Sequence, residues 1–252
     1  MQPNKSSLIG IPGAIIIAAA IIGISIIWTQ RPAALNTGPS SGASAAANAG
    51  SSAAMSPVTA DDHILGNPNA TIKLVEYSDP SCPYCQLFNP VMEQIMAQYG
   101  AAGKVAWVYR QFPLDQPGPD GAVLHPNAGH EAQAMECAAA LGGNTAFWAY
   151  EKKWYEVFPS DGSGAGRSAD ADNTQIASVG TSIGLDPVSF NECIASGRFK
   201  DKIAKSFTDG INAGVTGTPY TVLITPSGTK IPLVGAQTYQ TLKASIDALI
   251  QG

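Results

Sequence analysis

The distribution of apolar and polar residues divides the 252-residue chain into three regions with different patterns. After a polar tail over residues 1–7, residues 8–28 contain no charged side chain and are mostly Ile and Ala. A helix of this length spans about 30 Å, which matches the hydrocarbon core of a bilayer. The pattern predicts a transmembrane anchor over Leu8–Trp28, with Trp28 at the interface. A cleaved signal peptide is the alternative, although its apolar region is normally about half as long.

The second region, residues 29–60, is rich in Ala, Ser, Gly, Pro and Asn and has few large apolar side chains. Such a composition cannot bury enough apolar surface to offset the entropy that is lost on ordering. We therefore expect a flexible, disordered linker without a specific partner. The third region, residues 61–252, has the pattern of a globular domain.

Within this domain, apolar runs alternate with segments of helical periodicity. The apolar, β-branched runs predict strands, namely Ala70–Tyr77, Lys104–Arg110, Tyr220–Ile224 and Lys230–Val234. The periodic segments predict helices, namely 82–100, Asn127–Leu141, 144–158, Thr174–Ile183, Pro187–Ser196, Phe199–Asn212 and Tyr239–Ile250. Pro90 lies inside the first helix and should kink it by removing a backbone hydrogen bond. The order of elements is typical of an α/β layer fold.

Two cysteines separated by two residues carry the candidate chemistry. Cys82-Pro83-Tyr84-Cys85 follows the first predicted strand after the turn Ser78-Asp79-Pro80-Ser81 and begins a helix, where Pro83 is tolerated at the first position. Unpaired N–H groups and the helix dipole stabilise a thiolate there, so we expect the pKa of Cys82 to be low. Cys82, nearest the helix start and the more exposed, is the predicted nucleophile. Cys85, one turn deeper, is the predicted resolving thiol.

A metal clip or a static disulfide is the alternative interpretation of this cysteine pair. A zinc site would need further ligands, and His125 and His130 are separated from the pair by at least one strand. We therefore predict no metal ion and assign no catalytic role to His63, His125 or His130.

Further residues accompany this motif in a characteristic order. They are Glu76 before the cysteines, Pro90 after them, the strand Lys104–Arg110 and the segment Gly217-Thr218-Pro219. On these residues the chain resembles, over about Asp61–Gly252, the DsbA-like thiol-disulfide oxidoreductases of the thioredoxin superfamily. The resemblance implies a thioredoxin-like α/β fold in which a helical insertion, about residues 115–213, covers one side of the active site.

The resemblance also implies roles for three residues outside the cysteine motif. Pro219 would be a cis-proline that exposes the backbone of Thr218, so that a substrate strand can pair with it. An ordinary strand-initiating proline is the alternative. Glu76 would be a buried carboxylate that relays a proton near Cys85, whereas the alternative is a strand-end glutamate that faces water. Tyr84 replaces the histidine of the strongest oxidases in this group, which implies a less extreme oxidant.

Cys137 and Cys193 lie in two separate predicted helices of the insertion. The even cysteine count and an oxidising compartment favour a structural disulfide between them, and some DsbA-like proteins carry such a bridge. Two buried free thiols that behave as small apolar side chains are the alternative.

Charge and composition exclude one class of partner. The net charge is −5, and only 13% of the residues are charged, whereas nucleic-acid binding needs a basic face. The resemblance implies a membrane-anchored, extracytoplasmic dithiol oxidase that acts on newly exported, cysteine-containing proteins. It would need no cofactor besides the Cys82–Cys85 disulfide, which a quinone-linked membrane partner of the DsbB or VKOR type would reoxidise. A reductase or isomerase of the same fold, or a non-enzymatic binding module, remains the alternative.

Overall fold

The computed structural model describes residues 52, 54–118, 121–159 and 163–251. The predicted anchor Leu8–Trp28, the tail before it and most of the predicted linker lie outside these residues. Within the described ranges, none of the helices is long and apolar enough to cross a bilayer. Packing begins before residue 61, where the sequence pattern places the start of the domain: Met55 is buried and packs with Val75 and Tyr77.

A five-stranded sheet forms the centre of the domain, with the strand order β1-β3-β2-β4-β5. The strands are β1 (His63–Gly66), β2 (Ile72–Ser78), β3 (Val105–Gln111), β4 (Tyr220–Ile224) and β5 (Lys230–Val234). Strands β2 and β3 are parallel, and the other neighbouring pairs are antiparallel. The four predicted strands are confirmed within two residues. The edge strand β1, which is only four residues long, was not predicted.

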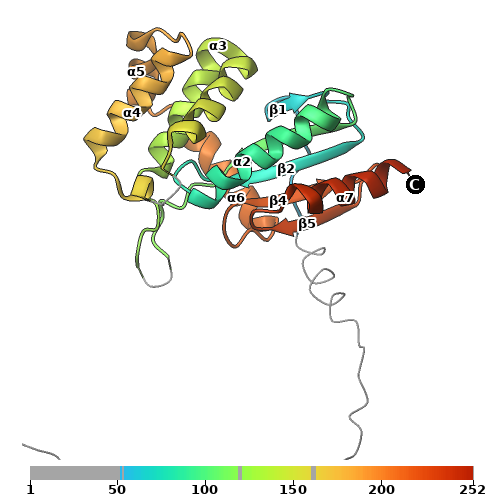
Figure 1. The fold of residues 1–252 in the computed structure, drawn as a ribbon. Helices are drawn as coiled ribbons and strands as arrows, with labels where there is room; N and C mark the ends of the chain where they lie inside the picture. Colours follow the sequence, from blue (N-terminus) through green and yellow to red (C-terminus); the bar gives the residue numbers. More distant parts are fainter. Residues whose placement is uncertain (1–51, 53, 119–120, 160–162, 252) are drawn as a thin grey trace, which may run out of the picture. The chain divides into compact units, whose positions relative to one another are not determined.

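The alternation of side chains along β2 divides the apolar core between the two faces of the sheet. Leu74 points to the face that α2 (Pro83–Ile95) and α7 (Tyr239–Gln251) cover together (Figure 1). Val75 and Tyr77 point to the other face, where Phe112 stacks on Phe207 of α6 (Lys200–Asn212) with ring centroids 4.4 Å apart. Because Glu76 shares the parity of Leu74, the sheet directs it toward α2.

The helical insertion predicted for about residues 115–213 is present, and its helices are α3 (Ala128–Val157), α4 (Ala169–Ser182), α5 (Pro187–Ser196) and α6. The two helices expected on either side of Gly142-Gly143 follow each other in α3, with a break at Gly143 (φ 70°, ψ −169°). Helix α4 starts five residues before its predicted N-terminus. The Ser168 hydroxyl caps it by accepting the N–H of Ala171 at 3.3 Å.

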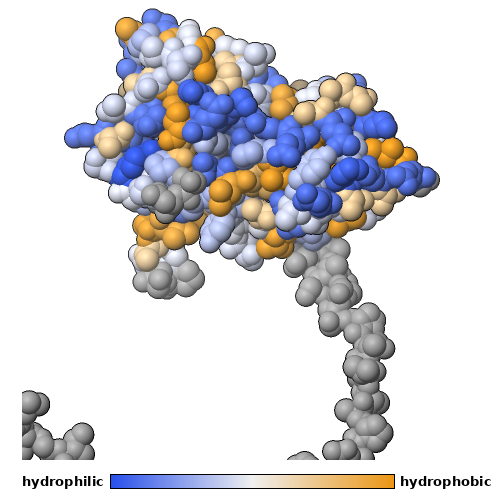
Figure 2. All heavy atoms as spheres, viewed as in Figure 1, coloured by the Kyte–Doolittle hydropathy of each residue, from blue (hydrophilic) through white to orange (hydrophobic). Residues whose placement is uncertain are grey.

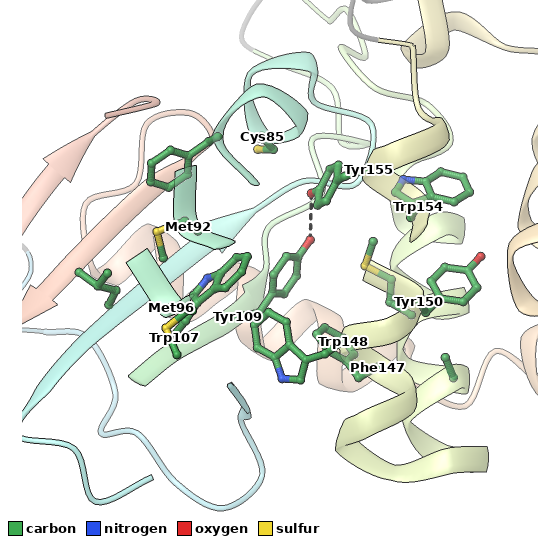
Figure 3. Close-up of a cluster of buried hydrophobic side chains, with 14 of the residues drawn as sticks. Cys85, Met92, Met96, Trp107, Tyr109, Phe147, Trp148, Tyr150, Trp154 and Tyr155 are labelled. Atoms are coloured by element: carbon green, nitrogen blue, oxygen red, sulfur yellow. Dashed lines mark hydrogen bonds between the residues drawn. The ribbon is translucent and has the colours of Figure 1, made fainter. Parts of the chain in front are cut away.

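The insertion shares its core with the sheet. Figure 3 shows aromatic side chains of α3 facing Trp107 and Tyr109 of β3, and Trp107 packs on Trp148 with ring centroids 4.7 Å apart. A disulfide with an S–S distance of 2.03 Å joins Cys137 of α3 to Cys193 of α5. The predicted pairing of these two cysteines is therefore present in the structure.

Candidate active site

The site is built on the turn that joins the central strand β2 to helix α2. Cys82 is the N-cap residue of α2 in an extended conformation, and Pro83 follows at the first helical position. No side chain in the described part of the chain caps this helix end by a hydrogen bond. The free N–H groups and the positive end of the helix dipole are therefore available to the sulfur of Cys82.

Cys82 and Cys85 are both thiols, and both are buried. Only 3% of Cys82 is exposed, so it is less accessible than the sequence suggests, although it remains the more exposed of the two. The neighbouring Tyr84 is 64% exposed and marks the outer side of the helix tip.

The two thiols differ strongly in acidity. Hydrogen bonding by the Cys85 thiol lowers the pKa of Cys82 to about 6 against the opposing effect of burial, and Thr218 also lowers it. Burial raises the pKa of Cys85 well above its usual value, and hydrogen bonding by Cys82 and the negative charges of Cys82 and Glu76 raise it further. At neutral pH the pair therefore consists of one thiolate and one thiol.

Glu76 lies on β2 beneath the cysteine pair. It is 2% exposed, so the alternative of a water-facing glutamate does not hold. Burial is the main cause that raises its pKa to about 7. Its Oε2 atom has no hydrogen-bond partner among the described residues. A carboxyl group that changes protonation near neutral pH thus lies close enough to Cys85 to raise the pKa of that thiol.

The Thr218–Pro219 segment lies directly against Cys82 although 136 residues separate them in the sequence. The peptide bond between Thr218 and Pro219 is cis, which agrees with the expectation for Pro219. The Cys82 thiol donates to the backbone oxygen of Thr218 at 3.4 Å. Strand β4, which begins at Tyr220, pairs with β2 and so fixes this loop beside the start of α2.

The insertion holds the turn from the other side. Trp154 Nε1 donates to the backbone oxygen of Pro80 at 2.9 Å, and the Tyr155 hydroxyl donates to that of Asp79 at 3.1 Å. Tyr155 also bonds Tyr109 of β3 at 3.2 Å, and Cys85 lies in the same cluster (Figure 3). The sequence gives no signal for these contacts, because the partners lie more than 70 residues from the turn.

The histidines occupy three different settings. His125 Nδ1 lies 2.8 Å from an oxygen of Asp79, a residue in the turn just before Cys82. The sequence pattern does not predict this contact. His63 bonds Glu136 and stacks on Phe147. His130 Nδ1 lies 3.6 Å from Asp172. Over the residues that the structure describes, no group of three or more His, Cys, Asp or Glu side chains is arranged to hold a metal ion.

Comparisons with known proteins agree with this architecture. The chain is 38% identical over 87 residues to the Na(+)/H(+) antiporter NhaA 1 of Mycolicibacterium gilvum, which covers 34% of the chain and 12% of the antiporter. A Rickettsia felis protein with the provisional name of protein-disulfide oxidoreductase is 24% identical over 153 residues, or 60% of the chain and 47% of that protein. The chain thus spans less than half the length of these relatives.

Solved structures and a family comparison extend the similarity over most of the domain. The crystal structure of Pseudomonas aeruginosa DsbA2 has a TM-score of 0.58 and 25% identity, covering 77% of this chain and 97% of that chain. The sequence model of a thioredoxin family matches residues 58–248, which is more than half of the chain. The protein therefore belongs to the thioredoxin family, and its domain has the DsbA-like form of that fold.

Proposed function

We propose that the protein is an extracytoplasmic thiol-disulfide oxidoreductase that introduces disulfides into exported proteins through Cys82 and Cys85. The observation that carries this proposal is the unequal acidity of the pair, with a pKa of about 6 for Cys82 and a strongly raised pKa for Cys85. A stabilised Cys82 thiolate stabilises the reduced pair and makes its disulfide the stronger oxidant. The electrons are carried by the two sulfurs, so no cofactor is required.

Oxidation of a client proceeds in two exchange steps. A client thiolate attacks Cys82 of the disulfide, and a mixed disulfide forms while Cys85 leaves as a thiolate. The high pKa of Cys85 means that this leaving sulfur takes up a proton. In this proposal Glu76, whose pKa of about 7 suits proton transfer at neutral pH, supplies it. A second client thiolate then attacks the client sulfur of the mixed disulfide. The client disulfide forms, and Cys82 leaves as the stabilised thiolate.

The backbone beside Cys82 provides a docking edge for the client. Thr218 presents its carbonyl oxygen to the Cys82 sulfur, and an extended client segment can pair with this backbone by edge addition. Recognition through backbone groups suits an enzyme that acts on many unfolded sequences, because it depends little on side-chain identity.

The membrane location remains part of the proposal. It is supported by the apolar segment Leu8–Trp28, and by the Cys137–Cys193 disulfide, since structural disulfides persist in oxidising compartments. A quinone-linked membrane partner of the DsbB or VKOR type would then return the Cys82–Cys85 pair to the disulfide state.

The equilibrium of the Cys82–Cys85 pair with glutathione tests the oxidase assignment. We expect the equilibrium to favour the reduced pair and oxidised glutathione. An equilibrium on the side of the Cys82–Cys85 disulfide would instead support the reductase or isomerase alternative, for which the uncharged Tyr84 in the spacer is the favouring observation.

Two variants test the roles of the two sulfurs. Cys85→Ala should accumulate a mixed disulfide with a disulfide-bonded peptide: the Cys82 thiolate attacks the peptide disulfide, one peptide thiolate leaves, and no Cys85 thiol remains to resolve the product. Cys82→Ser should form none and lose all exchange activity. Exchange that persists in Cys82→Ser would contradict the nucleophile assignment, and the absence of exchange in the unaltered protein would favour the binding-module alternative.

A further inference from the structure

A buried carboxylate organises the turn that presents Cys82. Asp79, the first residue after β2, is fully buried. Its Oδ1 accepts the N–H of Ser81 and its Oδ2 accepts the N–H of Leu114, both at 2.7 Å. Its backbone oxygen accepts the N–H of Cys82 at 3.0 Å. The position of Cys82 at the helix tip therefore depends on Asp79.

The charge of Asp79 also opposes the ionisation of the Cys82 thiol. A negative charge next to a thiol disfavours the thiolate, and the charge of Asp79 does raise the pKa of Cys82. A positive charge that compensates Asp79 would therefore favour the Cys82 thiolate. An uncompensated carboxylate in this buried turn would also be costly in itself.

His125 is the group that faces this carboxylate. It is 5% exposed, and its Nδ1 lies 2.8 Å from Asp79 Oδ2, an acceptor to which the ring N–H can donate. Burial alone would lower the pKa of His125, but the hydrogen bond and charge of Asp79, together with the charge of Cys82, raise it above its usual value. The imidazolium form is therefore favoured where both anions lie near it.

The other charged groups around the turn do not replace His125. Glu131 accepts the Ser81 hydroxyl at 2.5 Å, and burial and the charge of Asp172 raise its pKa to about 9, so it adds little charge at neutral pH. Arg167 is committed to Glu131 and Asp172, at 3.2 and 2.8 Å. Asp115 lies against Gly129 in the first turn of α3. Among the described residues, His125 is the cationic side chain that contacts Asp79.

We propose that His125 and Asp79 form a charge pair that keeps the Cys82 thiol ionised, with His125 as a positioning residue that does not touch the client. The inference rests on the proposed function and adds a second titrating group to it. Above the pH at which His125 loses its proton, Asp79 would face the Cys82 thiolate without compensation. Coupling is reciprocal, so forming the Cys82–Cys85 disulfide should make His125 release its proton at lower pH.

The substitution His125→Asn tests this pair, because the asparagine amide can still donate to Asp79 but carries no charge. The rate of alkylation of Cys82 by iodoacetamide is measured against pH in the reduced protein. We expect the apparent pKa of Cys82 to rise by about one unit, the lower end of the effect of a nearby opposite charge. The matched control is His130→Asn, which changes a histidine on α3 that is paired with Asp172 and not with Asp79. An unchanged alkylation profile in folded His125→Asn would overturn the proposal.

A second measurement needs no change to His125. The ring signals of His125 are followed by NMR against pH in the reduced and in the oxidised protein. The proposal requires a higher His125 pKa in the reduced form, and equal values in the two forms would overturn it. Both measurements report charge coupling whether or not the pair exchanges with glutathione. A coupled but inactive pair would therefore refute the proposed function and leave this inference standing.

Discussion

The protein contains two cysteine pairs, and exposure does not explain why one is a structural bridge and the other a candidate redox centre. Cys193 of the bridge is 5% exposed, whereas Cys82 is 3% exposed. The bridge joins the separate helices α3 and α5, while Cys82 is the N-cap of α2 and Cys85 lies in its first turn. The difference lies in electrostatics: hydrogen bonds from the Cys85 thiol, the Thr218 side chain and the Cys85 backbone at the helix start lower the pKa of Cys82.

All four cysteines lie in one apolar core, so the polar contacts around the two pairs make the difference. The bridge joins α3 to α5 within the insertion. The Cys82 turn is held by polar contacts from several segments and borders the surface, where Tyr84 is exposed. Figure 2 shows apolar patches between wide hydrophilic areas on one face of the molecule, and Val123 and Leu124 just before His125 are among the exposed apolar residues. The comparison indicates that the reactivity of Cys82 comes from the polar groups around the start of α2 and not from solvent exposure alone.

The largest expected effect is on the stability of the protein, and it distinguishes the Cys137–Cys193 disulfide from the Cys82–Cys85 pair. The double substitution Cys137→Ala and Cys193→Ala opens a loop with a sequence separation of 56 residues. On the chain-entropy estimate this lowers the free energy of unfolding by about 4 kcal/mol. Denaturant unfolding measures the loss, and the exchange rate with glutathione should stay at the level of the unaltered protein. Loss of exchange in the folded double variant would mean that the bridge also serves the redox site.

A smaller effect comes from the carboxyl group beside Cys85. The pKa of Glu76 is about 7 in the folded protein, against an ordinary value of 4.5. The folded state thus holds this proton more tightly than the unfolded state. The stability it contributes is complete below pH 4.5 and falls by about 3 kcal/mol as the pH rises to about 7.

The substitution Glu76→Gln should remove this part of the pH dependence. The measurement is urea unfolding of the reduced protein at pH 5 and pH 7.5, with Glu156→Gln as a control on the exposed surface of α3. A pH dependence identical to that of the unaltered protein would show that Glu76 does not hold a proton at pH 5 to 7. The buried Glu131 and Glu151 contribute with the same sign and remain in both variants.

The smallest effect tests the spacer between the two redox cysteines. Tyr84→His would place an imidazole that can carry positive charge near the Cys82 thiolate. We expect a lower pKa of Cys82 and a shift of about tenfold, or about 1.4 kcal/mol, toward the reduced pair in the glutathione equilibrium. Tyr84→Phe is the neutral control and should leave the equilibrium unchanged. A shift of the same size in both variants would assign the effect to packing and not to charge.

Much of the architecture follows from local sequence pattern. The strands β2 to β5 and the helices of the insertion agree with their predicted ranges within a few residues, because period and breaker residues are properties of neighbouring positions. The short strand β1 was missed, since four residues at a sheet edge leave almost no periodic signal. The composition of residues 29–60 predicts a linker that includes Met55, yet the Met55 side chain is buried in the core.

The candidate site divides in the same way. The sequence alone determined the Cys82–Cys85 motif, its place at a helix start and the expected acidity of Cys82, because these depend on residues within one turn of helix. Only the tertiary structure decided that Glu76 is buried, that Thr218 meets the Cys82 sulfur and that His125 contacts Asp79. Burial and long-range contacts are set by the packing of distant segments, and the ionisation of each buried group depends on those neighbours.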